Sequence, residues 1–195
     1  MNRRTHGSRF DVIGFDADDT LWRNEDYFTV VEQRFVELIT PYATPGIDPM
    51  ATLTEIETAS VPVTGYGVTA FALSMVQAAV RASDGRVPAT VIDDLVNSAY
   101  RIFDHPVELL DGVIDTLTSV ASTHRVVMIT KGDLLHQGRK IRASGIDHHF
   151  DQIEVVATKD ADTYRRVLDR WGIDPTRFAM VGNSVPSDIL PVLSI

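Results

Sequence analysis

Short apolar runs, each followed by a group of polar residues, occur in the two end portions of the chain. The first run is Val12-Ile13-Gly14-Phe15. Later runs of the same kind are residues 125–129, 153–156 and 178–181. Their length and flanking turns are typical of buried strands. Helical patterns accompany them at residues 113–120, 134–143 and 161–171. This alternation predicts an α/β fold with a Rossmann-like, mostly parallel sheet.

The middle of the chain has a purely helical pattern. Apolar residues recur at helical spacing in residues 25–38, 51–59, 68–82 and 89–103. Pro41, Pro45 and Pro49 follow the first of these segments, where we expect them to close it. We therefore predict that a helical domain, residues 23–105, is inserted into a discontinuous α/β core made of residues 1–22 and 106–195.

Composition limits the classes of function. The chain has 195 residues, of which 44% are hydrophobic, and it contains no cysteine, which excludes disulfides and thiolate nucleophiles. A net charge of -9 without a basic stripe argues against nucleic-acid binding. No apolar run is long enough to span a membrane, and no signal peptide is evident, so we expect a soluble cytoplasmic protein. The oligomeric state is not indicated.

The first predicted strand ends in Asp16-Ala17-Asp18-Asp19-Thr20. Open α/β sheets hold ligands at the carboxyl ends of their strands. Two carboxylates separated by one residue can share a divalent cation while only one of them attacks a substrate. A turn or a helix N-cap is the alternative interpretation of the same residues.

Polar residues suited to anion or metal chemistry also follow the three later strands. Thr130-Lys131-Gly132 can cradle a phosphoryl group, or form an ordinary turn. Lys159, one of three lysines in the chain, can pair with an attacking carboxylate, with Lys131 as a competitor for that role. In the segment 182–188, Asp188 can complete a magnesium site supported by Asn183 or Ser184, or serve as an N-cap.

Together these residues resemble the four motifs of the haloacid dehalogenase superfamily of hydrolases. The resemblance implies that Asp16 is the nucleophile, forming an aspartyl-phosphate, and that Asp18 is the general acid and base. It implies that Thr130 binds phosphoryl oxygens and that Lys159 holds the nucleophile and the transferring group. Mg2+ would be bound by Asp16, by the backbone carbonyl of Asp18 and by Asp188. The supporting residues would be Asp19, Lys131, Gly132, Asn183 and Ser184.

An aspartate at position 18 resembles the phosphatases and mutases of the superfamily, because its dehalogenases and ATPases carry other residues there. We therefore expect a magnesium-dependent phosphoric monoester hydrolase that acts on a small phosphorylated metabolite. A phosphomutase and a non-catalytic binding or scaffold member are the alternatives. The sequence does not identify the substrate.

The predicted insertion resembles the superfamily's helical cap, which closes over the site and carries specificity determinants. Possible substrate contacts in or beside it are Arg23, Tyr27, Tyr66 and Arg101, and a surface or packing role is the favoured alternative for each. Two features depart from the usual pattern: Asn183 stands where many members have an acidic residue, and the chain ends soon after the last motif, which suggests truncation. Arg139, Lys140 and Arg142 are expected to form a solvated helix face.

Overall fold

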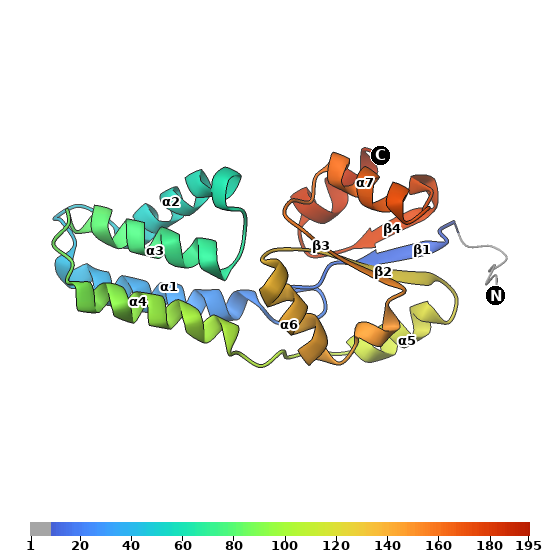
Figure 1. Ribbon diagram of the computed structural model, residues 1–195, viewed down its shortest axis with the longest axis horizontal. Coiled ribbons are helices and arrows are strands. Elements are labelled where there is room, and N and C mark those ends of the chain that lie inside the picture. Colours follow the sequence, from blue (N-terminus) through green and yellow to red (C-terminus); the bar gives the residue numbers. More distant parts are fainter. Residues whose placement is uncertain (1–8) are drawn as a thin grey trace. The chain divides into compact units, whose positions relative to one another are not determined.

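The computed structural model describes residues 9–195, which divide into two compact units. One unit contains the chain up to Asn24 together with Pro106–Ile195, and the other is Glu25–His105. The first junction between the units therefore follows Asn24. The sequence pattern predicts this junction two residues earlier, after Trp22. Figure 1 shows a sheet with helices in the first unit and helices alone in the second.

The first unit is built on a four-stranded sheet with the order β3-β2-β1-β4, in which every neighbouring pair is parallel. The strands are β1 (Val12–Phe15), β2 (Arg125–Lys131), β3 (Gln152–Val156) and β4 (Phe178–Val181). The predicted α/β fold with a parallel sheet is therefore confirmed. Strand β2 is longer than its apolar run because Thr130 and Lys131 continue the pairing with Val155 and Val156 of β3.

Helices cover both faces of this sheet (Figure 1). On one face, Phe15 and Met128 pack with Leu117 of α5 (Val113–Ala121) and Ile141 of α6 (Leu134–Ser144). On the other face, β-strand side chains pack with Tyr164 and other residues of α7 (Ala161–Arg170) and with the segment around α8 (Leu190–Leu193). Alternating strand residues supply the two clusters, as the two-residue period of a strand requires.

The register of the sheet brings the ends of its strands together. Phe15, the last residue of β1, pairs with Met128 of β2 and with Val181, the last residue of β4. The Asp16 N–H donates to the Val181 carbonyl at 2.8 Å. Strands β1 and β4 therefore end side by side. The polar residues that follow the parallel strands therefore emerge at one edge of the sheet.

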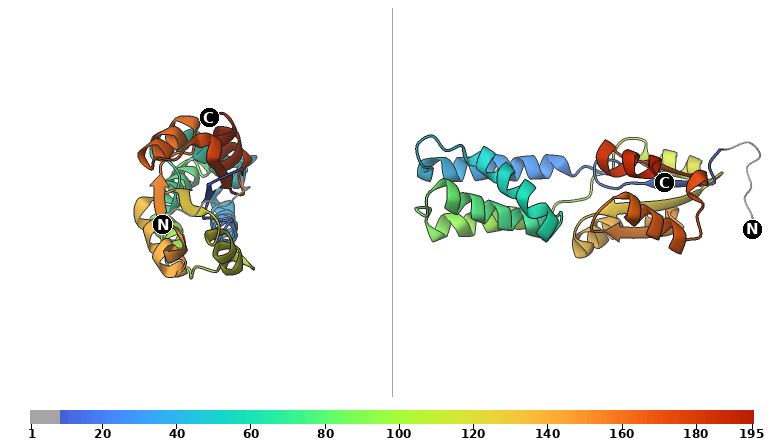
Figure 2. Two further views of the ribbon diagram at one scale, coloured as in Figure 1. Left: turned by 90° about the vertical axis from the view of Figure 1, so that its right-hand side faces the viewer. Right: turned by 90° about the horizontal axis from the view of Figure 1, so that it is seen from above.

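The second unit consists of four helices packed around one apolar cluster. Figure 2 shows these helices from two further directions. They are α1 (Glu25–Ile39), α2 (Pro49–Thr64), α3 (Val68–Ala82) and α4 (Ala89–Phe103). The fully buried side chains Phe35, Leu53, Met75 and Leu95 come one from each helix. Among the described residues, no helix has the length and apolar character that a membrane crossing needs.

Helix α2 differs most from the sequence prediction. It begins at Pro49, which had been assigned to the closure of the preceding helix. The Asp48 side chain accepts hydrogen bonds from the Met50 and Ala51 N–H groups, and proline is well suited to the first helical position. The helix also continues past Ala59 and through Pro62 to Thr64, where Gly65, with a φ of 70°, ends it.

Short helical turns complete the first and second units. Three are 3-10 turns, at Thr40–Tyr42, Asp147–His149 and Pro175–Arg177. The fourth is a π-helical turn at Val185–Ile189, which had not been predicted and which carries Asp188. Such turns often occur at functional sites because they displace a side chain from its regular helical direction.

Candidate active site

Four of the predicted site residues lie buried at the carboxyl edge of the sheet. Asp16 directly follows β1, Thr130 belongs to the end of β2, and Lys159 follows β3. Asp188 lies in the π-helical turn after β4. All four side chains belong to residues that are at most 7% exposed, so their polar groups must find partners inside the protein.

Lys159 links two of the carboxylates. Its Nζ donates to Asp188 Oδ1 at 2.6 Å and also forms an ion pair with Asp16 Oδ1. Burial raises the pKa of Asp16, the Lys159 ammonium opposes that rise, and the nearby Asp188 carboxylate adds to it. The lysine therefore holds together two negative charges that would otherwise repel each other in a poorly solvated site.

The turn after β4 is shaped around the Asp188 side chain. A Cβ at Gly182 would lie 2.3 Å from the Asp188 carboxyl carbon, so only glycine leaves room for that carboxylate. The Ser184 N–H donates to Asp188 Oδ2 at 3.0 Å, which fixes the second oxygen. Asn183 is exposed beside this turn. Asp188 is thus held from inside the turn and does not cap a helix.

The Asp18 carboxylate receives hydrogen bonds from three side chains. Trp22 Nε1 and Lys140 Nζ each donate to Asp18 Oδ1 at 2.6 Å, and Gln137 Nε2 donates to Oδ2 at 3.0 Å. Lys140 also donates to Asn24 Oδ1 at 3.0 Å. The expectation that Lys140 lies on a solvated helix face is therefore wrong: its side chain is 12% exposed, because α6 turns it toward Asp18, while Arg139 and Arg142 are exposed.

Thr130 and Asp18 share a hydrogen-bond donor. Gln137 Nε2 donates to Thr130 Oγ1 at 2.9 Å and to the Lys131 carbonyl at 2.9 Å, in addition to Asp18. Gly132 has a φ of 141°, and a Cβ there would lie 3.3 Å from Gln137 Cγ. The glycine therefore permits the close packing of this glutamine against the end of β2.

A second lysine and a tyrosine border the same cluster. Lys131 Nζ donates to Ser187 Oγ at 3.1 Å, and burial, followed by the charge of Lys159, lowers the Lys131 pKa. The Tyr164 hydroxyl donates to the Ser187 carbonyl at 3.1 Å. Burial and the Asp188 and Asp16 carboxylates raise the pKa of Tyr164, so this hydroxyl keeps its proton.

Asp19 supports the turn that follows β1. Its φ of 57° is left-handed, a conformation that aspartate tolerates better than most residues. Its N–H donates to the Trp22 carbonyl at 2.8 Å, and its Oδ1 accepts from the Asn24 N–H at 2.9 Å. This turn places the Trp22 indole against Asp18. The Thr20 hydroxyl lies 3.4 Å from Asp16 Oδ2, at the long end of hydrogen-bonding distance.

Comparison with known proteins identifies the family of this chain. The model of the family "haloacid dehalogenase-like hydrolase" matches residues 10–192. The chain belongs to this family. A solved haloacid dehalogenase-like family hydrolase from Xanthomonas campestris is 38% identical, with a TM-score of 0.91 over 98% of this chain and 80% of that one. No match was found among curated proteins.

More distant solved structures share the fold of this haloacid dehalogenase-like hydrolase. The HAD-hydrolase YfnB of Bacillus subtilis, solved bound to magnesium, is 17% identical, with a TM-score of 0.66 over 96% of this chain and 84% of that one. A 2-haloacid dehalogenase from Pseudomonas syringae is 20% identical, with a TM-score of 0.62 over 95% of this chain and 83% of that one. At these identities the similarity shows the fold and leaves the reaction of the present hydrolase open.

Sequence reasoning missed four side chains that contact the hydrolase's predicted site residues: Trp22, Gln137, Lys140 and Tyr164. Three of them had a recognisable signal. Trp22 is four residues after Asp18, and Gln137 and Lys140 are three residues apart, a spacing that places two side chains on one face of a helix. Nothing in the local pattern around Tyr164 distinguishes it from an ordinary core residue.

The hydrolase's residues fit a magnesium ion by their donor chemistry. Mg2+ prefers oxygen ligands and binds through one or two carboxylates while keeping several waters. Asp16 and Asp188 supply two carboxylates so close that a single lysine nitrogen pairs with both. Within the described chain there is no cluster of three or more histidine, cysteine or acidic side chains of the kind that forms an all-protein metal cage. A pair of carboxylates completed by water is a donor set that magnesium accepts.

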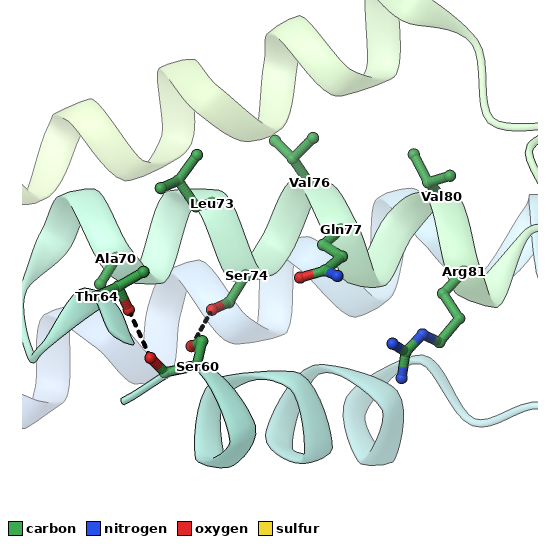
Figure 3. A pocket seen from close by; sticks show the side chains of 9 residues that line it. All are labelled: Ser60, Thr64, Ala70, Leu73, Ser74, Val76, Gln77, Val80 and Arg81. Atoms are coloured by element: carbon green, nitrogen blue, oxygen red, sulfur yellow. Dashed lines mark hydrogen bonds between the residues drawn. The ribbon is translucent and has the colours of Figure 1, made fainter. Parts of the chain in front are cut away.

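The residues suggested as cap contacts have different surroundings in the hydrolase. The Tyr27 ring stacks on His105 with ring centroids 3.7 Å apart. Arg23, Tyr66 and Arg101 are exposed. The helical unit contains an open groove of about 650 Å³ between α2 and α3 (Figure 3). In this groove the Ser60 and Ser74 hydroxyls lie 3.2 Å apart. The other residues that line it are Thr64, Ala70, Leu73, Val76, Gln77, Val80 and Arg81.

Proposed function

We propose that this haloacid dehalogenase-like hydrolase is a magnesium-dependent phosphatase that acts on a small phosphorylated metabolite through an aspartyl-phosphate on Asp16. The observation that carries the proposal is the presence of a second carboxylate, Asp18, two residues after a buried Asp16 that is paired with Lys159. Hydrolysis through a covalent intermediate needs both a nucleophile and a separate proton carrier.

In the first half of the reaction, an Asp16 oxygen attacks phosphorus and the bond to the substrate oxygen breaks. Asp18, in its acid form, donates a proton to that leaving oxygen. The Thr130 hydroxyl and the Lys159 ammonium bind the phosphoryl oxygens, and Lys159 also keeps the attacking carboxylate in place. Most of the catalysis in phosphoryl transfer comes from such positioning and charge neutralisation.

In the second half, water attacks the phosphorus of the aspartyl-phosphate and inorganic phosphate leaves, which restores the Asp16 carboxylate. Asp18, now ionised, takes the proton from that water. Magnesium, held by Asp16, Asp188 and the Asp18 backbone carbonyl, would neutralise charge on the transferring group. Asp19, Asn183 and Ser184 would support these ligands through the turns that carry them.

A phosphomutase would use the same residues but pass the phosphoryl group from Asp16 to a second hydroxyl. The two readings differ in how readily water reaches the aspartyl-phosphate. A non-catalytic binding role is the third candidate, and it gains no support from a chain that contains Asp16, Asp18 and Lys159.

Hydrolysis of 4-nitrophenyl phosphate tests the proposal. Purified protein is assayed with magnesium, with EDTA, and with magnesium restored, beside the Asp16→Asn variant. We expect turnover that requires magnesium and that falls by at least about 10⁴-fold in Asp16→Asn, because the variant lacks the nucleophile. Equal rates in Asp16→Asn and wild type would contradict the proposal. Phosphate transfer to an added acceptor sugar, in place of release to water, would favour the mutase.

A further inference from the structure

Helix α6 presents two donors to the Asp18 carboxylate. Gln137 and Lys140 are three residues apart, and they contact different oxygens of that carboxylate: Gln137 Nε2 is 3.0 Å from Oδ2 and Lys140 Nζ is 2.6 Å from Oδ1. Asp133 caps the start of α6 by accepting from the His136 N–H at 2.9 Å, which fixes the helix directly after β2. The two donors thus come from a rigid element.

The geometry of Gln137 is specific. Its residue is 2% exposed, and its single amide nitrogen serves three oxygens: Asp18 Oδ2, Thr130 Oγ1 and the Lys131 carbonyl. Its Oε1 is buried and has no hydrogen-bond partner among the described residues. A buried acceptor without a partner is energetically unfavourable. The orientation of the amide therefore places Nε2 on the site oxygens and leaves Oε1 without a partner.

Lys140 contributes a charge and a second tether. Its ammonium pairs with Asp18 and donates to Asn24 Oδ1 at 3.0 Å. Asn24 is the last residue before the inserted helical unit, and its N–H is bound by Asp19 Oδ1. The lysine thus joins the Asp18 carboxylate to the turn that carries it, so that both ends of this segment are fixed.

We propose that Gln137 and Lys140 are positioning residues that hold the Asp18 carboxylate in one orientation beside the Thr130 hydroxyl for proton transfer. The proposal rests on the proposed function, because it assigns them a role through Asp18 as the general acid and base. Gln137 Nε2 donates to both Asp18 and Thr130 and so holds the two side chains together. Lys140 prevents rotation of the Asp18 carboxylate away from Gln137 Nε2.

The test compares two substrates that differ in their need for a proton. Phenolate is a much poorer leaving group than 4-nitrophenolate, so phenyl phosphate depends more strongly on a well-placed acid. In Gln137→Met and Lys140→Met, kcat/KM for phenyl phosphate with magnesium should fall by roughly 10- to 100-fold more than kcat/KM for 4-nitrophenyl phosphate. Lys140→Arg should restore part of the loss.

Two controls separate positioning from a general structural effect. Arg139→Met removes an exposed cation from the same helix and should leave the ratio of the two kcat/KM values at the wild-type level. In an Asp18→Asn background, Lys140→Met should cause no further loss with phenyl phosphate, because residues that act through one group are not additive. Gln137→Met keeps the side-chain length and supplies an independent test if Lys140→Met does not fold.

The possible outcomes distinguish the two proposals. Absence of magnesium-dependent turnover in folded wild-type protein would overturn the proposed function and this inference with it. Turnover that is lost in Asp16→Asn, with a wild-type substrate ratio in folded Gln137→Met and Lys140→Met, would overturn the positioning role alone. A further loss from Lys140→Met in the Asp18→Asn background would likewise contradict it.

Discussion

The two units of the molecule treat their buried acidic side chains differently. In the α/β unit, Asp16 and Asp188 pair with Lys159, and Asp18 pairs with Lys140. In the helical unit, Glu57 is partly buried, and its pKa rises to about 7 through burial and then through the charges of Glu32 and Glu25. The α/β unit therefore provides cations beside its buried carboxylates, whereas the helical unit places the partly buried Glu57 near two further glutamates.

This difference indicates where charge is needed. Burying ions is unfavourable, and a buried ion pair stabilises a fold little compared with an apolar replacement. Lysines at the sheet edge are therefore poorly explained by stability, and they are well explained by a reaction that uses charged carboxylates. In the helical unit, the elevated pKa of Glu57 lets the protein reduce its electrostatic cost by binding a proton.

Among the variants predicted here, removal of the Lys159 ammonium should lower the stability of the protein most. Lys159→Met would leave Asp16 and Asp188 buried without their shared partner, and we expect unfolding free energy to fall by about 3–5 kcal/mol at neutral pH. Urea denaturation followed by circular dichroism measures the change. Lys159→Met should also abolish the proposed phosphatase turnover, because the ammonium that holds Asp16 is gone.

A charge-matched variant checks the cause of that loss. Combining Lys159→Met with Asp16→Asn removes one of the two unpaired charges, so the double variant should be more stable than Lys159→Met alone. Equal stability of the single and double variants would indicate that the lysine acts through packing of its aliphatic chain.

The sequence predicted the order of strands and helices well because these elements have strong periodic patterns and clear closing residues. The strand Val12–Phe15 and the helix Val68–Ala82 have the predicted bounds. The start of α2 was mistaken because Pro49 was read as the end of one helix when Asp48 makes it the start of the next. The π-helical turn around Asp188 could not be predicted, because the sequence there has no periodic pattern of apolar residues.

The candidate site was predicted unevenly for a related reason. Residues that follow strands, such as Asp16 and Lys159, are brought together by parallel register, which the sequence pattern indicates. Gln137 and Lys140 join the site through the direction of α6, which depends on how that helix packs against the sheet. Side-chain direction of this kind is set by tertiary structure, and the charge pattern alone favoured a solvated face for Lys140.

Because the Glu57 pKa is raised, we expect the unfolding free energy to depend on pH, an effect smaller than that of Lys159→Met. Because the folded-state pKa of Glu57, about 7, lies above its ordinary value of 4.5, the folded form binds the extra proton between these values. The contribution of Glu57 to stability is therefore full below about pH 4.5 and is lost as pH rises toward 7 and above. Glu57→Gln should raise the unfolding free energy by about 1 kcal/mol at pH 8, after allowance for partial solvent screening.

Denaturation at two pH values measures this effect. Glu57→Gln and wild type should be equally stable at pH 4 and should differ at pH 8. Glu37→Gln, which changes an exposed glutamate on α1, is the control for the loss of a surface carboxylate. A Glu57→Gln variant whose advantage is the same at both pH values would show that the gain is not electrostatic.

The smallest effect is expected where an acidic side chain of the helical unit does have a cation beside it. Arg81 of α3 pairs with Glu55 of α2 at 3.1 Å, but the two side chains are 52% and 72% exposed. Solvent screens such a pair, so its coupling energy should be no more than about 0.5 kcal/mol. A double-mutant cycle with Arg81→Met and Glu55→Gln measures it, since methionine keeps the length of the stem. A coupling energy as large as that between Lys159 and Asp16 would mean that burial is not what distinguishes the paired carboxylates of the sheet edge.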